Sequence, residues 1–439
     1  MERYFARDAL LPGGWAKDVL VSVEGGEIVA VETGASGPQP LAGPVLPGMA
    51  NLHSHAFQRA MAGLTELAAG DDDFWSWREL MYRFAERLTP DQAQVIAHFL
   101  YIEMLRNGYT AVGEFHYLHR PDGMLQAHLD AAREAGIAIT LMPSVYRWAG
   151  FGERPLAARQ RRFERDTDSV LEAFMGLAAR ASPEVRIGVS PHSLRAVDPG
   201  ALAALIKGVP RDAPIHIHAA EQTREVDECV AALGARPVQW LLANMPVDRR
   251  WCIVHATHLE KDEIQGLARS GAVAGLCPST EGNLGDGIFP LIAYRAAGGR
   301  YGIGGDSHVS RCPAEELRLL EYLQRLSLGK RNLVTTDELP SVGTTLWLEA
   351  AAGGAQALGR RMGALAPGMR ADLVVLDGEH PDLAGRDGDA AANALVFSGS
   401  ADLVRDVMVA GQWAVQQKHH AAEEAAASRY KDAVRHFLP

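Results

Sequence analysis

Short apolar runs alternate with helix-period segments along most of the chain. Thr89-Pro90-Asp91-Gln92 and Asp198-Pro199 carry the signals that open helices. Eight strand–helix units over roughly 300 residues predict an α/β fold, a (β/α)8 TIM barrel. A doubly wound open sheet is the alternative, but no Gly-rich dinucleotide fingerprint follows any run. The runs are the one that precedes His53 and residues 110–115, 137–142, 185–189, 214–217, 251–254, 272–276 and 301–303.

The pattern changes at both ends of the chain. Residues 18–33 alternate apolar and polar positions around Gly25-Gly26, which predicts a β-hairpin. Residues 363–376 and 404–415 read as further strands. We therefore expect a small β-sandwich domain built from both chain termini, residues 1–46 plus 360–418. The barrel should span residues 47–359, and residues 419–439 should form a C-terminal helix.

Composition narrows the class of protein. The chain has 439 residues, 47% of them hydrophobic, which is enough for a sizeable core. A net charge of -11 argues against nucleic-acid or anionic-membrane partners, although local arginines can still bind a small anionic substrate. Four cysteines without CxxC spacing predict free thiols, and no apolar run is long enough for a membrane span. We expect a cytoplasmic protein. We also expect a homodimer, because twofold dimers are the most common oligomers of soluble proteins.

The candidate chemistry lies where predicted strands end. His53 and His55 close the first run, and residues i and i+2 of an extended chain share one face, so both can reach one metal ion. Catalytic groups of a (β/α)8 barrel gather at the carboxyl ends of its strands. Several downstream residues pass that test of position: His116, His192, His218, Glu221, His255 and Asp306.

His53, His55, His218 and Asp306 would form a mononuclear metal site with a position left for water. Zn²⁺ suits these ligands best, and Fe²⁺ or Mn²⁺ would also fit. The spacing leaves His216 as an alternative to His218, because both point to one face of their strand. His258 likewise competes with His255, but it lies three residues beyond the strand end.

Taken together, these residues resemble the amidohydrolase superfamily, whose pattern is HxH after strand one, His after strands five and six, and Asp after strand eight. Ser190-Pro191-His192 stands where a metal-bridging lysine would follow strand four, and this resembles the mononuclear deaminase branch. Residues 52–63, 113–119, 190–197 and 277–287 look like the formimidoylglutamate deiminase family of histidine degradation. Such enzymes hydrolyse N-formimino-L-glutamate to N-formyl-L-glutamate and ammonia.

The resemblance also implies roles for individual residues. Glu221, His255 and Asp306 would be catalytic: Asp306 takes a proton from the attacking water, His255 contacts that water or the tetrahedral oxygen, and Glu221 protonates the leaving nitrogen. The remaining implied residues would contact the dianionic substrate, with arginines suited to its carboxylates. They are Gln58, Arg78, Tyr117, His192 and Arg195.

Three other functions compete with this interpretation. A related deaminase of a nucleobase or nucleoside would want aromatic stacking partners rather than paired arginines. A cyclic amide hydrolase usually needs two metals and a bridging lysine carbamate. A non-catalytic scaffold would have lost metal ligands that this chain retains.

Overall fold

A closed barrel of parallel strands forms the centre of the molecule. The computed structural model describes residues 1–66, 74–399, 401–435 and 437. The barrel strands pair in the orders β5-β6-β7-β8 and β10-β11-β12-β13. Parallel bridges Val189–Ile215 and Ser54–Asp306 close the two seams between these sheets. The predicted barrel is confirmed, and the open-sheet alternative is wrong. Its strands are β5 (Met49–Ser54), β6 (Tyr109–His116), β7 (Ala138–Val145), β8 (Val185–Ile187), β10 (Ile215–Ala219), β11 (Trp251–His255), β12 (Val273–Leu276) and β13 (Arg300–Ile303), and the short β9 (Ser190–Pro191) pairs with β7.

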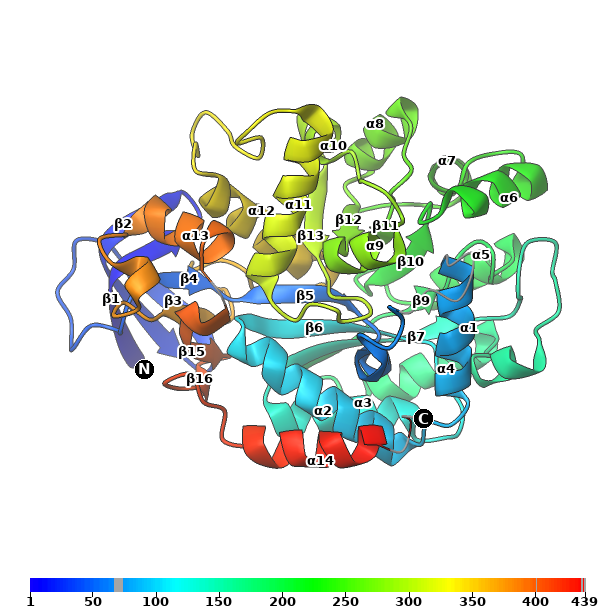
Figure 1. Ribbon diagram of the computed structural model, residues 1–439, viewed down its shortest axis with the longest axis horizontal. Coiled ribbons are helices and arrows are strands. Elements are labelled where there is room, and N and C mark those ends of the chain that lie inside the picture. Colours follow the sequence, from blue (N-terminus) through cyan, green and yellow to red (C-terminus); the bar gives the residue numbers. More distant parts are fainter. Residues whose placement is uncertain (67–73, 400, 436, 438–439) are drawn as a thin grey trace.

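Helices surround the barrel (Figure 1). Thr89 caps one of them as predicted, because its hydroxyl accepts the Gln92 N–H at 3.3 Å, and the Asp198 carboxylate accepts the Ala201 N–H at 2.9 Å. The helices are α1 (Phe74–Ala85), α2 (Pro90–Arg106), α3 (Met124–Ala135), α4 (Thr167–Ala178), α5 (Pro199–Gly208), α6 (Thr223–Leu233), α7 (Pro237–Asn244), α8 (Lys261–Ser270), α9 (Pro278–Leu284), α10 (Leu291–Ala296), α11 (Pro313–Leu328), α12 (Val342–Ala357), α13 (Gly388–Phe397) and α14 (Glu423–Arg435).

Both chain termini contribute to one seven-stranded sheet beside the barrel. Its order is β16-β15-β14-β4-β1-β2-β3. The sheet curls so that non-adjacent strands face each other, and the rings of Tyr4 on β1 and Trp413 on β16 lie 5.7 Å apart. The buried residues Val21, Val45 and Val375 belong to the core between these faces. The strands are β1 (Glu2–Leu11), β2 (Gly14–Glu24), β3 (Glu27–Glu32), β4 (Val45–Pro47), β14 (Leu373–Leu376), β15 (Val404–Val409) and β16 (Gln412–Val415).

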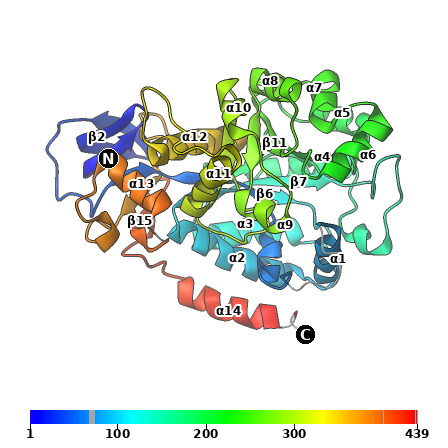
Figure 2. The same ribbon diagram turned by 45° about the horizontal axis from the view of Figure 1, so that its top comes forward.

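Two helices near the C-terminus pack against helices that surround the barrel. α13, which no sequence pattern predicted, packs against α11 and α12. α14 lies along α2, and Figure 2 shows it at the edge of the molecule. His420, just before α14, is buried with its Nε2 3.0 Å from the Ala135 carbonyl oxygen, so it anchors the helix start. Among the described helices, none is both long and apolar enough to cross a membrane.

The carboxyl ends of the barrel strands face away from the terminal sheet. Figure 1 shows β5 running from that sheet towards the end of the barrel where α1 stands. α1 belongs to the insertion that follows β5, and its side chains reach over the barrel mouth. The candidate functional residues therefore lie at the barrel mouth, beneath α1.

Candidate active site

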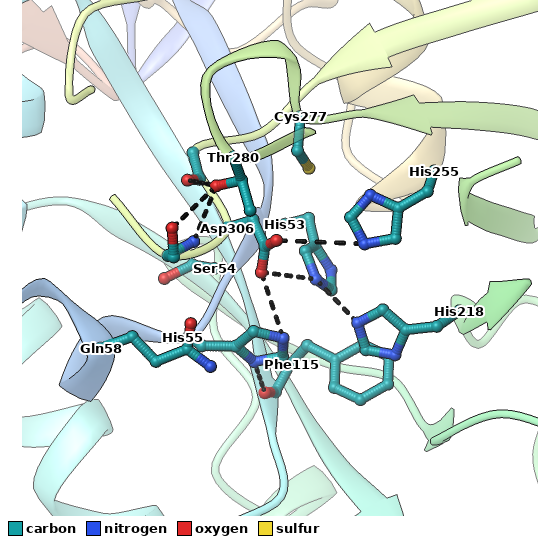
Figure 3. Close-up of polar contacts among 12 residues, drawn as sticks. His53, Ser54, His55, Gln58, Phe115, His218, His255, Cys277, Thr280 and Asp306 are labelled. Atoms are coloured by element: carbon teal, nitrogen blue, oxygen red, sulfur yellow. Dashed lines mark hydrogen bonds and ion pairs between the residues drawn. The ribbon is translucent and has the colours of Figure 1, made fainter. Parts of the chain in front are cut away.

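Three histidines and an aspartate meet at the mouth of the barrel (Figure 3). His53 and His55 come from β5, His218 from β10, and Asp306 follows β13. The Asp306 Oδ1 atom lies 3.5 Å from His53 Nε2 and 3.4 Å from His55 Nε2. His218 Nε2 is 3.2 Å from His53 Nε2. All four residues are buried, so the strand topology brings together the complete set of predicted metal ligands.

Backbone carbonyls fix which imidazole nitrogens can bind a cation. His55 Nδ1 is 2.8 Å from the Phe115 carbonyl oxygen, and His218 Nδ1 is 2.9 Å from that of His192. A carbonyl only accepts, so each Nδ1 carries the hydrogen and each Nε2 presents a lone pair to the centre of the site. Lone pairs that face one another and a carboxylate repel unless a cation lies between them. The donor set therefore fits a divalent metal ion.

The protonation states also suit metal binding. Burial lowers the pKa of His53 and of His218 well below the ordinary value, and neighbouring histidines lower both further. The pKa of His55 is lowered too, mainly by burial. All three imidazoles are therefore neutral near pH 7, which is the form that ligates a metal.

The backbone around Asp306 is unusually tight. Asp306 adopts φ +50° and His255 φ +64°, a left-handed conformation that costs non-glycine residues energy and is often found at functional sites. A Cβ atom on Gly304 would lie 2.9 Å from the backbone of His53, and one on Gly305 would lie 2.6 Å from His308 Nδ1. The two glycines therefore let the end of β13 approach β5 closely enough to place Asp306 among the histidines.

His255 lies among carboxylates beside the metal ligands. Its Nε2 is 3.6 Å from Glu221 Oε1 and 3.9 Å from Asp306 Oδ2, while its Nδ1 is 3.2 Å from Glu281 Oε1. Burial opposes the charged imidazolium, but these carboxylates outweigh it and raise the pKa of His255 well above the usual value. Burial raises the pKa of Glu221 to about 7, with Asp306 adding to the shift. The pair therefore combines a cationic donor with a carboxyl group that titrates near neutrality.

A cavity with about 50 Å³ of free space opens from these residues towards α1. Gln58 and Tyr117 share a hydrogen bond of 2.7 Å from Gln58 Nε2 to the Tyr117 hydroxyl. The buried side chains of Arg78, on α1, and Arg195, after β9, line the wall. His192 lines the cavity beside the predicted metal ligands, with its ring 4.9 Å from that of His218. The five predicted substrate-binding residues thus line one cavity with the predicted catalytic groups.

Three of the other histidines considered from the sequence lie elsewhere. His216 shares a strand face with His218 but lies deeper, with its Nε2 2.9 Å from the Ala357 carbonyl oxygen. His258 does not line the cavity. His116 points away from the cavity, into a buried cluster with Glu114 and His128. The alternation of side chains explains this, because its neighbour Phe115 faces the metal ligands.

Several residues of this site were not predicted, and Glu281 and Tyr146 are two of them. Glu281 fixes the orientation of His255 and also accepts the Cys277 N–H at 2.8 Å. Tyr146 directly follows β7 and lines the cavity. Glu281 lies within the motif at residues 277–287, which was a usable signal, whereas nothing in the sequence around Tyr146 marks it.

A buried hydrogen-bond network supports the His53–His55 strand. The Ser54 hydroxyl donates to Glu114 at 2.5 Å, and its oxygen lies 2.8 Å from His308 Nε2. The Ala56 N–H and the Tyr101 hydroxyl also donate to Glu114, so this carboxylate is fully engaged. Ser54 therefore ties β5 both to β6 and to the segment that carries Asp306.

Ser54→Ala is expected to lower the free energy of unfolding by about 1–3 kcal/mol, because it leaves buried partners unsatisfied. Urea denaturation followed by circular dichroism measures the change. Ser327→Ala, at an exposed position of α11, is the matched control and should lose no stability. A Ser54→Ala midpoint equal to that of the unmodified chain would contradict the assigned network.

Similarity to known proteins extends over the whole chain. Residues 45–414 match the model of the amidohydrolase family, and residues 1–40 match that of the formimidoylglutamate deiminase HutF N-terminal domain. A formimidoylglutamate deiminase of Pseudomonas aeruginosa is 52% identical, over 98% of each chain. A 5-methylthioadenosine/S-adenosylhomocysteine deaminase of Natronomonas pharaonis is 30% identical, over 95% of this chain and 93% of its own. The crystal structure of an amidohydrolase from Brucella melitensis superposes with a TM-score of 0.94 at 43% identity, covering 100% of both chains.

The chain therefore belongs to the amidohydrolase family, as the barrel and its histidine pattern already indicated. Within that family it falls among the formimidoylglutamate deiminases.

Proposed function

We propose that the chain hydrolyses N-formimino-L-glutamate to N-formyl-L-glutamate and ammonia, as a step of histidine degradation. The observation that carries this proposal is the polarity of the cavity. The cavity joins the predicted metal ligands, Glu221 and His255 to a wall that holds the buried Arg78, on α1, and Arg195, after β9. Such a cavity suits a linear substrate that is electrophilic at one end and carries carboxylates along its length.

His53, His55, His218 and Asp306 would hold one divalent ion, and we propose Zn²⁺, although Fe²⁺ and Mn²⁺ accept the same ligands. When bound, such an ion polarises water and lowers its pKa from about 15.7 towards roughly 7. The neutral histidines would leave the ion a net positive charge, since Asp306 is the single carboxylate of the proposed set.

Dialysis against a chelator should abolish activity, and added Zn²⁺ should restore it.

Three side chains would then accept or donate protons or hydrogen bonds during the reaction. Asp306 accepts a proton from the water that attacks the formimino carbon. His255, kept charged by its carboxylate neighbours, donates a hydrogen bond to the oxygen that becomes negative on attack. Glu221 gives a proton to the terminal nitrogen, which leaves as ammonia. Protonating that nitrogen, rather than the one attached to glutamate, decides which C–N bond breaks.

The substrate contacts follow from the same cavity. Arg78 and Arg195 would bind carboxylate oxygens, and Gln58 with Tyr117 would orient the formimino group from the side of His55. His192 is neutral, because burial and the nearby charges of Arg195 and Arg78 lower its pKa well below the usual range. It can therefore donate from one ring nitrogen to the substrate while adding no charge.

Arg195→Met is expected to raise KM for N-formimino-L-glutamate by about 10–100-fold with a smaller change in kcat, because a charge-assisted hydrogen bond contributes about 1.5–3 kcal/mol. Steady-state ammonia release measures both constants. Arg224→Met, on the outer side of α6, is the matched control and should leave them unchanged. Unaltered kinetics in Arg195→Met would remove this residue from the substrate site.

Deamination of a nucleobase or nucleoside is the second candidate function. The 30% identity to the Natronomonas pharaonis deaminase favours it. An 8-oxoguanine deaminase of Pseudomonas aeruginosa is also 30% identical, over 84% of this chain. The two buried arginines of the cavity wall weigh against it, because guanidinium groups suit a substrate with carboxylates better than a neutral ring. Cytoplasmic location and a homodimer stay predictions, and light scattering on the purified protein tests the second.

A further inference from the structure

Asp286 is a buried carboxyl group that the proposed mechanism leaves without a role. The residue is only 4% exposed. Its Oδ1 accepts an N–H from the Gln222 side-chain amide, whereas Oδ2 has no hydrogen-bond partner in the part of the chain that the structure describes. A buried polar atom without a partner costs free energy and is rare in folded proteins. Oδ2 is therefore available to a small molecule that reaches it.

The turn after α9 fixes the place of this carboxyl group. The Asp286 N–H donates to the Glu281 carbonyl oxygen at 2.9 Å, which holds the turn against the helix. Gly287 has φ +132°, and a Cβ atom at its position would lie 3.2 Å from the Thr257 side chain. Glycine therefore lets the turn pack closely against the segment after β11, the strand that ends in His255.

Asp286 lies next to the proposed proton donor Glu221. One side-chain atom from each of Glu221, His255 and Asp286 lies within 4.8 Å of the other two. Glu221 and His255 line the substrate cavity, whereas Asp286 does not, so Asp286 lies on their far side. A nitrogen placed between the oxygens of Glu221 and Asp286 can lie at a hydrogen-bond distance of about 2.9 Å from both. A group in this place has left the substrate cavity.

The charges around Asp286 keep a proton on it. Burial raises the pKa of Asp286 to about 9. The charge of His255 opposes this shift, and three nearby carboxylates add to it, those of Glu221, Glu281 and Asp306. Because Oδ1 already accepts an amide N–H, the hydrogen belongs on Oδ2, where it needs an acceptor. The place between Asp286 and Glu221 therefore suits a small neutral molecule that has both a lone pair and N–H groups.

We propose that Asp286 captures the leaving group, by donating its proton to ammonia once the C–N bond of N-formimino-L-glutamate has broken. The lone pair of ammonia accepts the Asp286 hydrogen, and its N–H groups donate to the Glu221 carboxylate. The Asp286 O–H bond breaks as a fourth N–H bond forms, so that two carboxylates hold an ammonium ion. A proton from solvent returns to Asp286 after the ion leaves.

The protonation makes the release of the leaving group one-way. Ammonium has no lone pair, so it can neither attack the formyl product nor bind a metal ion. This inference rests on the proposed function and extends it to the departure of its product. It also assigns a role to Gln222, whose amide holds Oδ1 and leaves Oδ2 to face the nitrogen.

The test is inhibition by added ammonium chloride, with consumption of N-formimino-L-glutamate as the measured rate and sodium chloride at equal ionic strength as the reference. Ammonium chloride should inhibit the unmodified chain. In Asp286→Asn, which cannot become a carboxylate, its inhibition constant should rise about 10–100-fold, because a charge-assisted hydrogen bond is lost. Inhibition by N-formyl-L-glutamate should change less than about threefold. Asp262→Asn, exposed on α8, is the matched control and should change neither constant.

A second measurement uses the unmodified chain alone. Trimethylammonium has the same charge as ammonium, but its methyl groups do not fit between two carboxyl oxygens that lie within 4.8 Å of each other. It should inhibit at least about tenfold more weakly than ammonium. Equal inhibition by the two cations, or equal ammonium inhibition of Asp286→Asn and the unmodified chain, would overturn the capture of ammonia by Asp286. Failure to consume N-formimino-L-glutamate at all would instead remove the proposed function itself.

Discussion

Asp306→Asn should reduce ammonia release by more than about 10⁴-fold, because one change removes a metal ligand and the group that accepts the proton of the attacking water. Asparagine has the same shape and tolerates the left-handed backbone of this position, so the fold should survive. Steady-state turnover and metal analysis on the same preparation measure both effects.

The unfolding curve shows whether the loss is chemical or structural. In the metal-free protein, Asp306 places a carboxylate 3.4 Å from the lone pair of His55 Nε2, so its neutralisation should not destabilise the fold. Asp227→Asn, an exposed change on α6, is the matched control. Retention of the metal and of more than about one-hundredth of the activity would remove Asp306 from both roles.

Glu221→Gln should lower kcat by about 10²–10⁴-fold while the metal stays bound, because Glu221 moves a proton but is not one of the proposed ligands. Glutamine fills the same buried space and can still face His255 Nε2, which lies 3.6 Å from Glu221 Oε1. Glu228→Gln, at a partly exposed position of α6, serves as control. A near-normal rate would show that another group protonates the leaving nitrogen.

The pH dependence gives a second view of Glu221. Its pKa is raised to about 7, mainly by burial, with Asp306 and Glu225 adding to the shift and His255 and Arg195 opposing it. Because the protonated carboxyl is the form that donates, kcat should fall as pH rises through about 7. Glu221→Gln should lose this decline. Its persistence in the variant would assign the decline to another group.

The barrel could be predicted because each strand is an apolar run that ends in a turn. The carboxyl ends of parallel strands meet at one mouth, so His53, His218, His255 and Asp306 were expected to be neighbours. The choice between His216 and His218 lay beyond the sequence. It depends on which backbone carbonyl each ring meets, and those carbonyls belong to Ala357 and His192, which are distant in the chain.

The residues that were missed act through contacts between distant segments. Tyr146 matters because Arg78 from α1 and Gln160 from the loop after β7 converge on its oxygen. Glu281 matters because α9 places it against His255. Neither contact follows from a local pattern, and α13 escaped prediction because its packing against α11 and α12 decides its conformation.

Ammonia release from N-formimino-L-glutamate, guanine and cytosine, measured in parallel with the bound metal quantified in the same sample, tests the proposed metal-dependent deimination most directly. We expect rapid turnover of N-formimino-L-glutamate, negligible turnover of both nucleobases, and about one divalent ion per chain. Faster release from a nucleobase, or full turnover in a metal-free sample, would contradict the assignment.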